Sequence, residues 1–143
     1  MPFTPFHLGP ALLIGLIMLP ILDLPTFLVA SVIVDIEPVA VLFLKLDAPL
    51  HGVVHTFLAG TLLAFILALI MFFLREKIKT VMRIVKLEQS PSFNKILLTS
   101  LAGVYVHILL DSFIYTDIKP FYLLTLNPLY GLMSPTNVCL FCI

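Results

Sequence analysis

The four histidines of this chain, His7, His51, His55 and His107, lie within or beside apolar stretches, where an imidazole is costly to bury. Two of them form His51-x-x-x-His55, and His107-x-x-x-Asp111 pairs the last one with a carboxylate. Residues four apart share one face of a helix, so each pair can present two metal ligands to the same point. Two such pairs on facing helices supply four ligands, which is enough for a tetrahedral site.

A further polar feature is Asp35-Ile36-Glu37-Pro38, which interrupts another apolar stretch. Pro38 has no N–H and its ring opposes the carbonyl of Val34, so the sequence predicts a kink there. Asp35 and Glu37 are two residues apart and cannot both point the same way on a regular helix. One carboxylate is then a ligand and the other a base, or the kink brings both together, or both cap a broken helix.

Composition indicates what must position these side chains. Of the 143 residues, 61% are hydrophobic and 11% are charged, and the mean hydropathy is +1.16. These values are typical of an integral membrane protein, because soluble domains are about half apolar. The formal net charge is zero, which argues against nucleic acid as a partner and leaves the lipid bilayer as the predicted environment.

Four apolar segments predict an all-α, polytopic transmembrane helical bundle that forms one domain. The predicted spans are residues 8–22, 26–44, 53–74 and 96–115. The first is short for a full span, and the other three are close to the length that crosses a hydrocarbon core. The apolar segment 117–143 is interrupted by prolines, so we expect a cap or a re-entrant segment instead of a further helix.

Basic residues predict the orientation of the bundle. Six of the eight Lys and Arg residues lie in the segment 75–95: Arg75, Lys77, Lys79, Arg83, Lys86 and Lys95. The positive-inside rule puts this loop in the cytoplasm and the N-terminus outside. We expect the location to be the plasma membrane of a prokaryote. Apolar residues recur among the charges with helical spacing, which favours an amphipathic helix on the inner leaflet. The first residues lack the basic region of a secretory signal, so we expect His7 to remain in the mature protein.

In this topology seven polar residues share one depth, in the outer half of the bilayer. They are His7, Asp35, Glu37, His51, His55, His107 and Asp111. A charged or polar side chain inside a membrane usually faces the bundle interior and serves function, and a divalent metal offsets the cost of burying carboxylates. We therefore predict one shared site. The alternatives are histidines bonded to backbone at the membrane boundary and a buried His107–Asp111 hydrogen bond without metal.

Small residues next to these motifs predict close helix packing. Every fourth residue is small from Gly52 through Gly60 to Ala68. A second stripe, of small and polar residues, consists of Ser100, Gly103, His107, Asp111 and Tyr115. Tyr115 is a candidate to support the ligands, whereas Asp23 and Asp47 are assigned no role. Cys139-x-x-Cys142 is a conceivable redox pair, but no thioredoxin-like pattern surrounds it.

The motifs together resemble the membrane-bound metal-dependent hydrolases of bacteria and archaea. The matching pieces are Phe6-His7-Leu8-Gly9-Pro10, Asp35-Ile36-Glu37-Pro38, the segment 51–56 and the segment 107–111. The resemblance covers most of the chain and implies a hydrolase. Bacterial members often carry Arg after the first His of the His-x-x-x-His motif, where this chain has Gly52, so an anion-binding role of that Arg does not transfer.

The resulting hypothesis is a metal-dependent hydrolase that acts on a lipid-linked ester or phosphoester at the extracytoplasmic side. The predicted main ligands are His51, His55, His107 and Asp111, with His7 and Asp35 completing the site or binding a second metal. Zinc suits imidazole-rich ligation best, with manganese and iron as alternatives. Glu37 is the expected general base, with Asp35 as the other carboxylate of the catalytic centre.

Two other function classes remain open. An ion or proton transporter could use the same residues as a relay, although the predicted third and fourth spans are apolar toward the cytoplasm. A non-catalytic subunit of a membrane complex fits the small size and the basic segment but leaves the histidines unexplained. Metal flux would favour the first, and metal-free protein whose stability is unchanged by His→Ala substitutions would favour the second.

Overall fold

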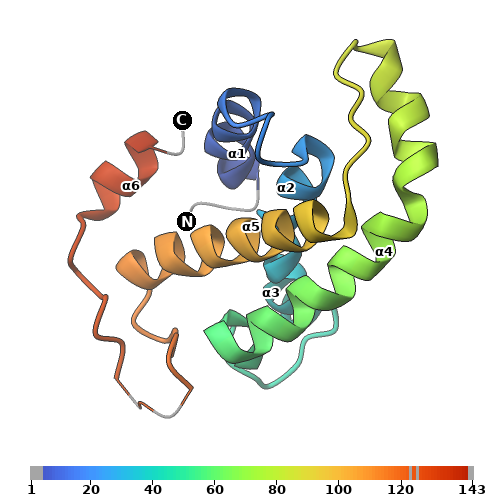
Figure 1. Ribbon diagram of the computed structural model, residues 1–143. Helices are drawn as coiled ribbons and strands as arrows, with labels where there is room; N and C mark the ends of the chain where they lie inside the picture. The colour runs from blue at the N-terminus through green and yellow to red at the C-terminus, as the bar shows by residue number, and fades with distance from the viewer. Residues whose placement is uncertain (1–4, 123, 125, 142–143) are drawn as a thin grey trace.

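The computed structural model describes residues 5–122, 124 and 126–141, and every regular element in that part of the chain is a helix (Figure 1). The α-helices are α1 Pro5–Ile17, α2 Leu24–Ala30, α3 Ile36–Phe43, α4 Phe57–Ile84, α5 Phe93–Ile114 and α6 Pro135–Phe141. Two short 3-10 turns, η1 Ile33–Asp35 and η2 Val53–His55, precede α3 and α4. The predicted all-α fold is confirmed.

Three helical stretches are long and apolar enough to cross a membrane: Leu24–Phe43, Phe57–Ile84 and Phe93–Ile114. The first predicted span corresponds to α1, which has only 13 residues. At about 1.5 Å per residue α1 is about 20 Å long, less than a hydrocarbon core of about 30 Å. A membrane protein is thus supported by three helices, while a fourth span and the orientation of the N-terminus stay predictions.

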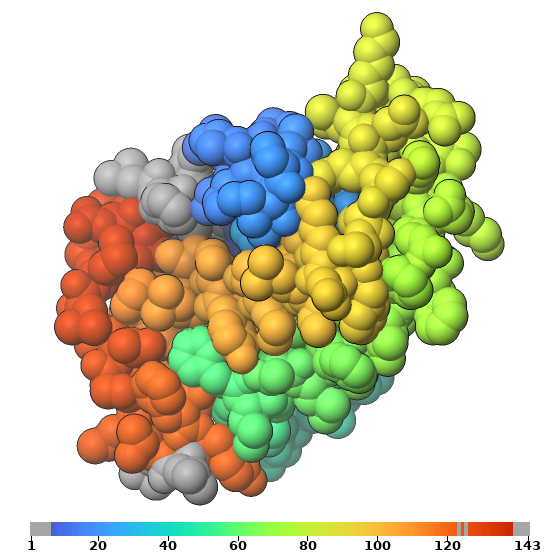
Figure 2. Space-filling view, in the orientation of Figure 1, coloured from blue at the N-terminus to red at the C-terminus, as the bar shows by residue number. Residues whose placement is uncertain are grey.

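Helix α5 is the centre of the fold. In Figures 1 and 2 it crosses the molecule between α1 and α2 on one side and the start of α4 on the other. Gly60 of α4 packs so closely on α5 that a Cβ there would lie 2.7 Å from Ile108 Cδ1. A Cβ on Gly103 of α5 would lie 2.5 Å from the Cβ of Ala30. Small residues of both predicted stripes therefore let α2 and α4 approach α5.

The second apolar stretch is broken earlier than predicted. Helix α2 ends at Ala30, and α3 begins only at Ile36, after η1. Pro38 lies in the first turn of α3, where a missing N–H is tolerated. The predicted kink at Pro38 is therefore wrong in position. The helix stops at Ala30 and restarts at Ile36, before the proline, instead of bending at it.

The His51-x-x-x-His55 motif does not lie on a helix, which corrects the predicted shared helical face. Thr56 is the N-cap of α4 and has an extended backbone, and its Oγ1 accepts a hydrogen bond from Ala59 N at 3.1 Å. This cap starts the helix at Phe57, so both histidines precede it. Helix α4 accordingly begins four residues after the start of the predicted span 53–74.

The basic segment is not a separate surface helix, contrary to the prediction. Helix α4 continues without a break to Ile84, well past the first basic residue, Arg75. It ends where Lys86 takes a left-handed backbone with φ 58° and Leu87 N donates to Met82 O at 3.1 Å, a Schellman-type stop. The connection to α5 is correspondingly short, and Ser92 caps that helix.

The C-terminal segment returns along the bundle. Phe57 N–H donates to the carbonyl of Pro120 at 2.9 Å, so the segment touches the start of α4. Val138 of α6 is buried against Leu110 of α5. Cys142 lies outside the described residues, as does the side chain of Cys139.

Candidate metal centre

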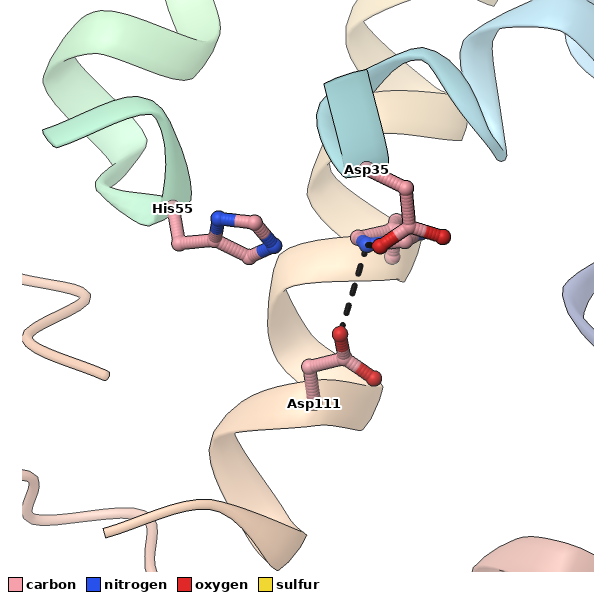
Figure 3. Close-up of side chains that lie close together, drawn as sticks. Asp35, His55 and Asp111 are labelled. Atoms are coloured by element: carbon pink, nitrogen blue, oxygen red, sulfur yellow. Dashed lines mark ion pairs between the residues drawn. The ribbon is translucent and has the colours of Figure 1, made fainter. Parts of the chain in front are cut away.

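Four buried side chains from three segments converge beside the C-terminal half of α5. His107 and Asp111 belong to α5, Asp35 ends η1, and His55 ends η2. One ligand atom from each lies within 4.8 Å of the other three. Each residue is at most 9% exposed. We call these four residues the buried quartet (Figure 3).

The quartet has two carboxylates around one imidazole. His107 Nε2 lies 3.3 Å from Asp111 Oδ2 and 3.4 Å from Asp35 Oδ1. Figure 3 shows His55 pointing toward Asp35 and Asp111 from the turn before α4. Segments far apart in the sequence thus direct nitrogen and oxygen atoms at one point.

The break in the second span fixes the proton position of His107. His107 Nδ1 lies 2.7 Å from the carbonyl oxygen of Ser31, the residue that follows α2. A carbonyl can only accept, so Nδ1 carries the hydrogen. In the neutral ring the lone pair is then on Nε2, which faces Asp35 and Asp111. This is how a protein orients a metal-binding histidine through its other nitrogen.

Glu37 fixes the proton position of His55. Its Oε2 lies 3.0 Å from His55 Nδ1, and its two oxygens also accept from Gly52 N at 3.0 Å and Val54 N at 3.3 Å. Burial lowers the pKa of His55, and the hydrogen bond to Glu37 offsets this only in part. His55 is therefore neutral near pH 7, with Nε2 as the acceptor that faces the quartet.

Gly52 leaves room for this carboxylate. A Cβ at position 52 would lie 2.7 Å from Glu37 Oε1, closer than a carbon and an oxygen atom can approach without overlap. Any other residue there would displace Glu37, and with it the hydrogen bond that orients His55.

The chemistry of the quartet suits a cation. Two buried carboxylates and two imidazoles face one another, and burying a carboxylate charge without a compensating positive charge costs several kcal/mol. Among the described residues, the buried polar atoms that make no hydrogen bond include His7 Nδ1, His55 Nε2, His107 Nε2 and Asp111 Oδ1. A divalent metal satisfies this donor set, so the residues fit one. A proton on His107 is the alternative, but it neutralises only one of the two carboxylates.

His7, a predicted ligand, lies against the quartet. Its Nε2 is 3.2 Å from Asp111 Oδ1, and its ring centroid is 4.4 Å from that of His107. It comes from α1, and only 4% of it is exposed. The N-terminal helix therefore closes one side of the centre, and His7 contacts the ligand Asp111.

His51, predicted as a main ligand, lies next to the quartet and is not part of it. Its Nδ1 is 2.9 Å from Asp117 Oδ2, and its ring packs 4.3 Å from that of Tyr115 and 4.8 Å from that of His55. Asp117 was missed in the sequence because it follows the last span and looked like a loop residue. Its position six residues after Asp111, beyond a helix end, was the available signal.

The structure thus separates the seven predicted site residues into groups. It brings together Asp35, His55, His107 and Asp111, with His7 in contact. It places Glu37 behind His55 and His51 against Asp117. The role of Glu37 as a general base stays a prediction.

Comparisons with models of known protein families, with curated proteins and with solved structures give no match for this chain. The resemblance to membrane-bound metal-dependent hydrolases therefore stays a prediction that rests on the sequence motifs, and the geometry of the quartet is the structural observation that bears on function.

Proposed function

We propose that this protein is a membrane-embedded metal-dependent hydrolase that acts on a lipid-linked ester or phosphoester. The observation that carries the proposal is the buried quartet, in which hydrogen bonds at Nδ1 turn both imidazole Nε2 atoms toward two carboxylates. A hydrogen-bonded structural cluster has no need of such an arrangement, whereas a metal centre does.

Asp35, His55, His107 and Asp111 would hold the metal, and zinc suits two nitrogen and two oxygen ligands. A divalent ion there supplies a Lewis acid and, by activating water, a nucleophile at neutral pH. Glu37 holds His55 in its tautomer, and the Ser31 carbonyl holds His107 in its own. Since both oxygens of Glu37 are engaged, we assign it a positioning role in place of the base expected from the sequence.

A groove on the outer surface supports a lipid substrate. Apolar side chains of α2, η1 and α3 line an open groove of about 300 Å³, and Asp35 is its one charged residue. Asp35 therefore belongs to both the groove and the quartet. An acyl chain in the groove would bring an attached ester or phosphoester next to the candidate metal ligands.

The membrane side of the site follows from the basic residues. Lys95 lies in the first turn of α5 and Asp111 in its last turns, so the basic end and the quartet are at opposite ends of one helix. The positive-inside rule puts the basic end in the cytoplasm, which opens the quartet to the extracytoplasmic side of a prokaryotic plasma membrane.

Turnover by the purified, zinc-loaded protein tests the proposal. Detergent micelles containing lipid esters and lipid phosphoesters should release product with wild-type protein and none above background with Asp35→Asn, which keeps the shape of the side chain. Product release that is equal in both proteins would contradict the proposal. Metal bound without turnover of either lipid class would reject the hydrolase and leave transport, which metal flux in proteoliposomes measures.

A further inference from the structure

A second site with ligand-binding chemistry lies at the other end of α5, distant from the quartet. The second half of α4 and the segment 89–93 run side by side in Figure 1 and line an open pocket of about 410 Å³. Arg75 and Lys79 are its basic residues, and Phe72 and Phe93 are its aromatic ones. Cationic and apolar surfaces thus meet in one concavity.

The pocket lies at the level of lipid headgroups. Residues 57–74 of α4 carry no charge, and Arg75 is the first charged residue after them. At about 1.5 Å per residue this uncharged stretch is about 27 Å long, close to a hydrocarbon core of about 30 Å. Helix α4 continues to Ile84, so its last turns project beyond the core and carry Arg75 and Lys79 into the headgroup region.

The two cations are arranged to act together. Arg75 and Lys79 are four residues apart on α4 and so share one face. The Arg75 guanidinium stacks on Phe72, with Cζ 3.9 Å from the ring centroid, and this fixes the side chain at the pocket wall. Glu76 also lines the pocket, 3.5 Å from Arg75 Nε, but it is 76% exposed and directed to water.

Other polar residues of this end are used to hold the fold. Gln89 Nε2 donates to the carbonyls of Leu19 and Leu22, both at 2.9 Å, and Lys95 Nζ donates to Leu19 O at 3.0 Å. Arg75 and Lys79 are not part of this network. Their position beside a cavity at headgroup depth therefore calls for a different partner.

We propose that this pocket binds the headgroup of an anionic glycerophospholipid. Arg75 and Lys79 contact the phosphodiester oxygens, and the hydroxyls of Ser90 and Ser92 donate to the same group. The acyl chains lie along the exposed apolar face of α4, where Phe73 is 83% exposed. This site is independent of the buried quartet and goes beyond the proposed hydrolase activity.

Native mass spectrometry of the full chain in detergent tests the proposal, with phosphatidylglycerol and phosphatidylcholine as probes. The test variant is Arg75→Gln/Lys79→Gln. The matched control is Lys77→Gln/Lys86→Gln, which removes the same charge from the same region but touches neither pocket wall. Wild type and control should retain phosphatidylglycerol in preference to phosphatidylcholine. The test variant should lose this preference by roughly tenfold or more, because each basic residue near an anionic surface contributes about 1 kcal/mol.

Two results would overturn the proposal. Equal loss of phosphatidylglycerol in both double variants would show general attraction of anions to the basic end instead of a site. Displacement of the lipid by inorganic phosphate, but not by chloride at equal ionic strength, would show a site for a small anion instead of a lipid. Helix content from circular dichroism of each variant checks that the bundle remains folded.

Discussion

Two clusters of buried or half-buried polar side chains pack against α5, near opposite ends, and they differ in how their hydrogen bonds are completed. The first, here the Asp23 cluster, consists of Asp23, Thr26, Gln89 and Thr99. Asp23 caps α2 by accepting from Thr26 N at 3.2 Å and from the Thr26 hydroxyl, while its own N–H donates to Thr99 Oγ1 at 3.0 Å. Gln89 uses both ends of its amide on the same loop.

In the buried quartet the carboxylates face imidazole nitrogens instead. Asp35 and Asp111 face His107 Nε2 at 3.3–3.4 Å, and Nε2 makes no hydrogen bond among the described residues. His55 Nε2 likewise makes no hydrogen bond among the described residues. Each ring uses its Nδ1 hydrogen on the side away from the quartet, His55 toward Glu37 and His107 toward the Ser31 carbonyl.

The difference separates a structural cluster from a site. A buried carboxylate whose oxygens accept backbone and hydroxyl hydrogen bonds holds a loop and a helix start, as Asp23 does. Two carboxylates that face imidazole nitrogens suit a cation, which is the basis of the proposed metal centre. The proposal thus gives the same residue type two functions on neighbouring elements, according to its hydrogen-bond partners.

The largest expected contrast between the clusters is the response to metal. Zinc added to chelator-treated wild-type protein should raise its melting temperature, because a ligand at about 100 times its dissociation constant stabilises the folded state by about 2.7 kcal/mol. His107→Ala should abolish this rise, and Thr99→Ala, in the Asp23 cluster, should keep it. Differential scanning fluorimetry measures both, and an equal rise in His107→Ala would mean that zinc binds elsewhere.

Glu37→Gln should weaken zinc binding by about 10- to 100-fold, the range for partners that orient a metal-binding histidine. The amide still fits, but a Gln side chain has one acceptor oxygen where Glu37 uses two for the His55 ring and two backbone amides. Competition with a chromophoric chelator measures the affinity. The exposed carboxylate of Glu76 provides the control substitution, Glu76→Gln, and unchanged affinity in Glu37→Gln would refute the positioning role.

Asp23→Ala should lower the free energy of unfolding by about 1–2 kcal/mol, as expected for the loss of an N-cap, without changing zinc affinity. Chemical denaturation in mixed micelles measures the first quantity. Asp47→Ala is the matched control, because Asp47 is an exposed carboxylate at another loop. A fall in zinc affinity in Asp23→Ala would show that the two clusters are not separate.

Gly52→Ala should produce the smallest effect, a loss of zinc affinity below that of Glu37→Gln. The added methyl would lie 2.7 Å from Glu37 Oε1 and push the carboxylate from His55. A double-mutant cycle tests the mechanism, because Glu37→Ala removes the obstructed atom. Gly52→Ala should then cause no further loss in the Glu37→Ala background, and additive losses would point to a different cause.

Much of the fold and the centre of the site were predictable because burying charge in a membrane is so costly. Three of the apolar stretches are helical and long enough to cross a membrane, and Asp35, His55, His107 and Asp111 were all candidate ligands. Hydropathy and charge indicate which residues belong inside and at what depth. They do not indicate which atoms meet.

The errors arose where a local cap or turn decided the geometry. The Thr56 cap starts α4 after His55, so His51 turns to Asp117 and does not join the quartet. The Schellman-type stop at Lys86 lengthens α4 through the basic segment. The contact between Glu37 and His55 depends on the loop before α4, and its sequence gives no periodic signal there. Capping preferences are weak compared with packing, so sequence patterns alone do not fix these points.

The most direct test of the central claim is the metal content of detergent-purified protein, measured by inductively coupled plasma mass spectrometry. Wild type should be compared with His55→Ala/His107→Ala and with Asp23→Ala. We predict about one equivalent of a transition metal in wild type and Asp23→Ala, as one four-ligand site would hold, and its loss in the histidine double variant. Wild-type protein that binds no metal after reconstitution with zinc, manganese or iron would contradict the account.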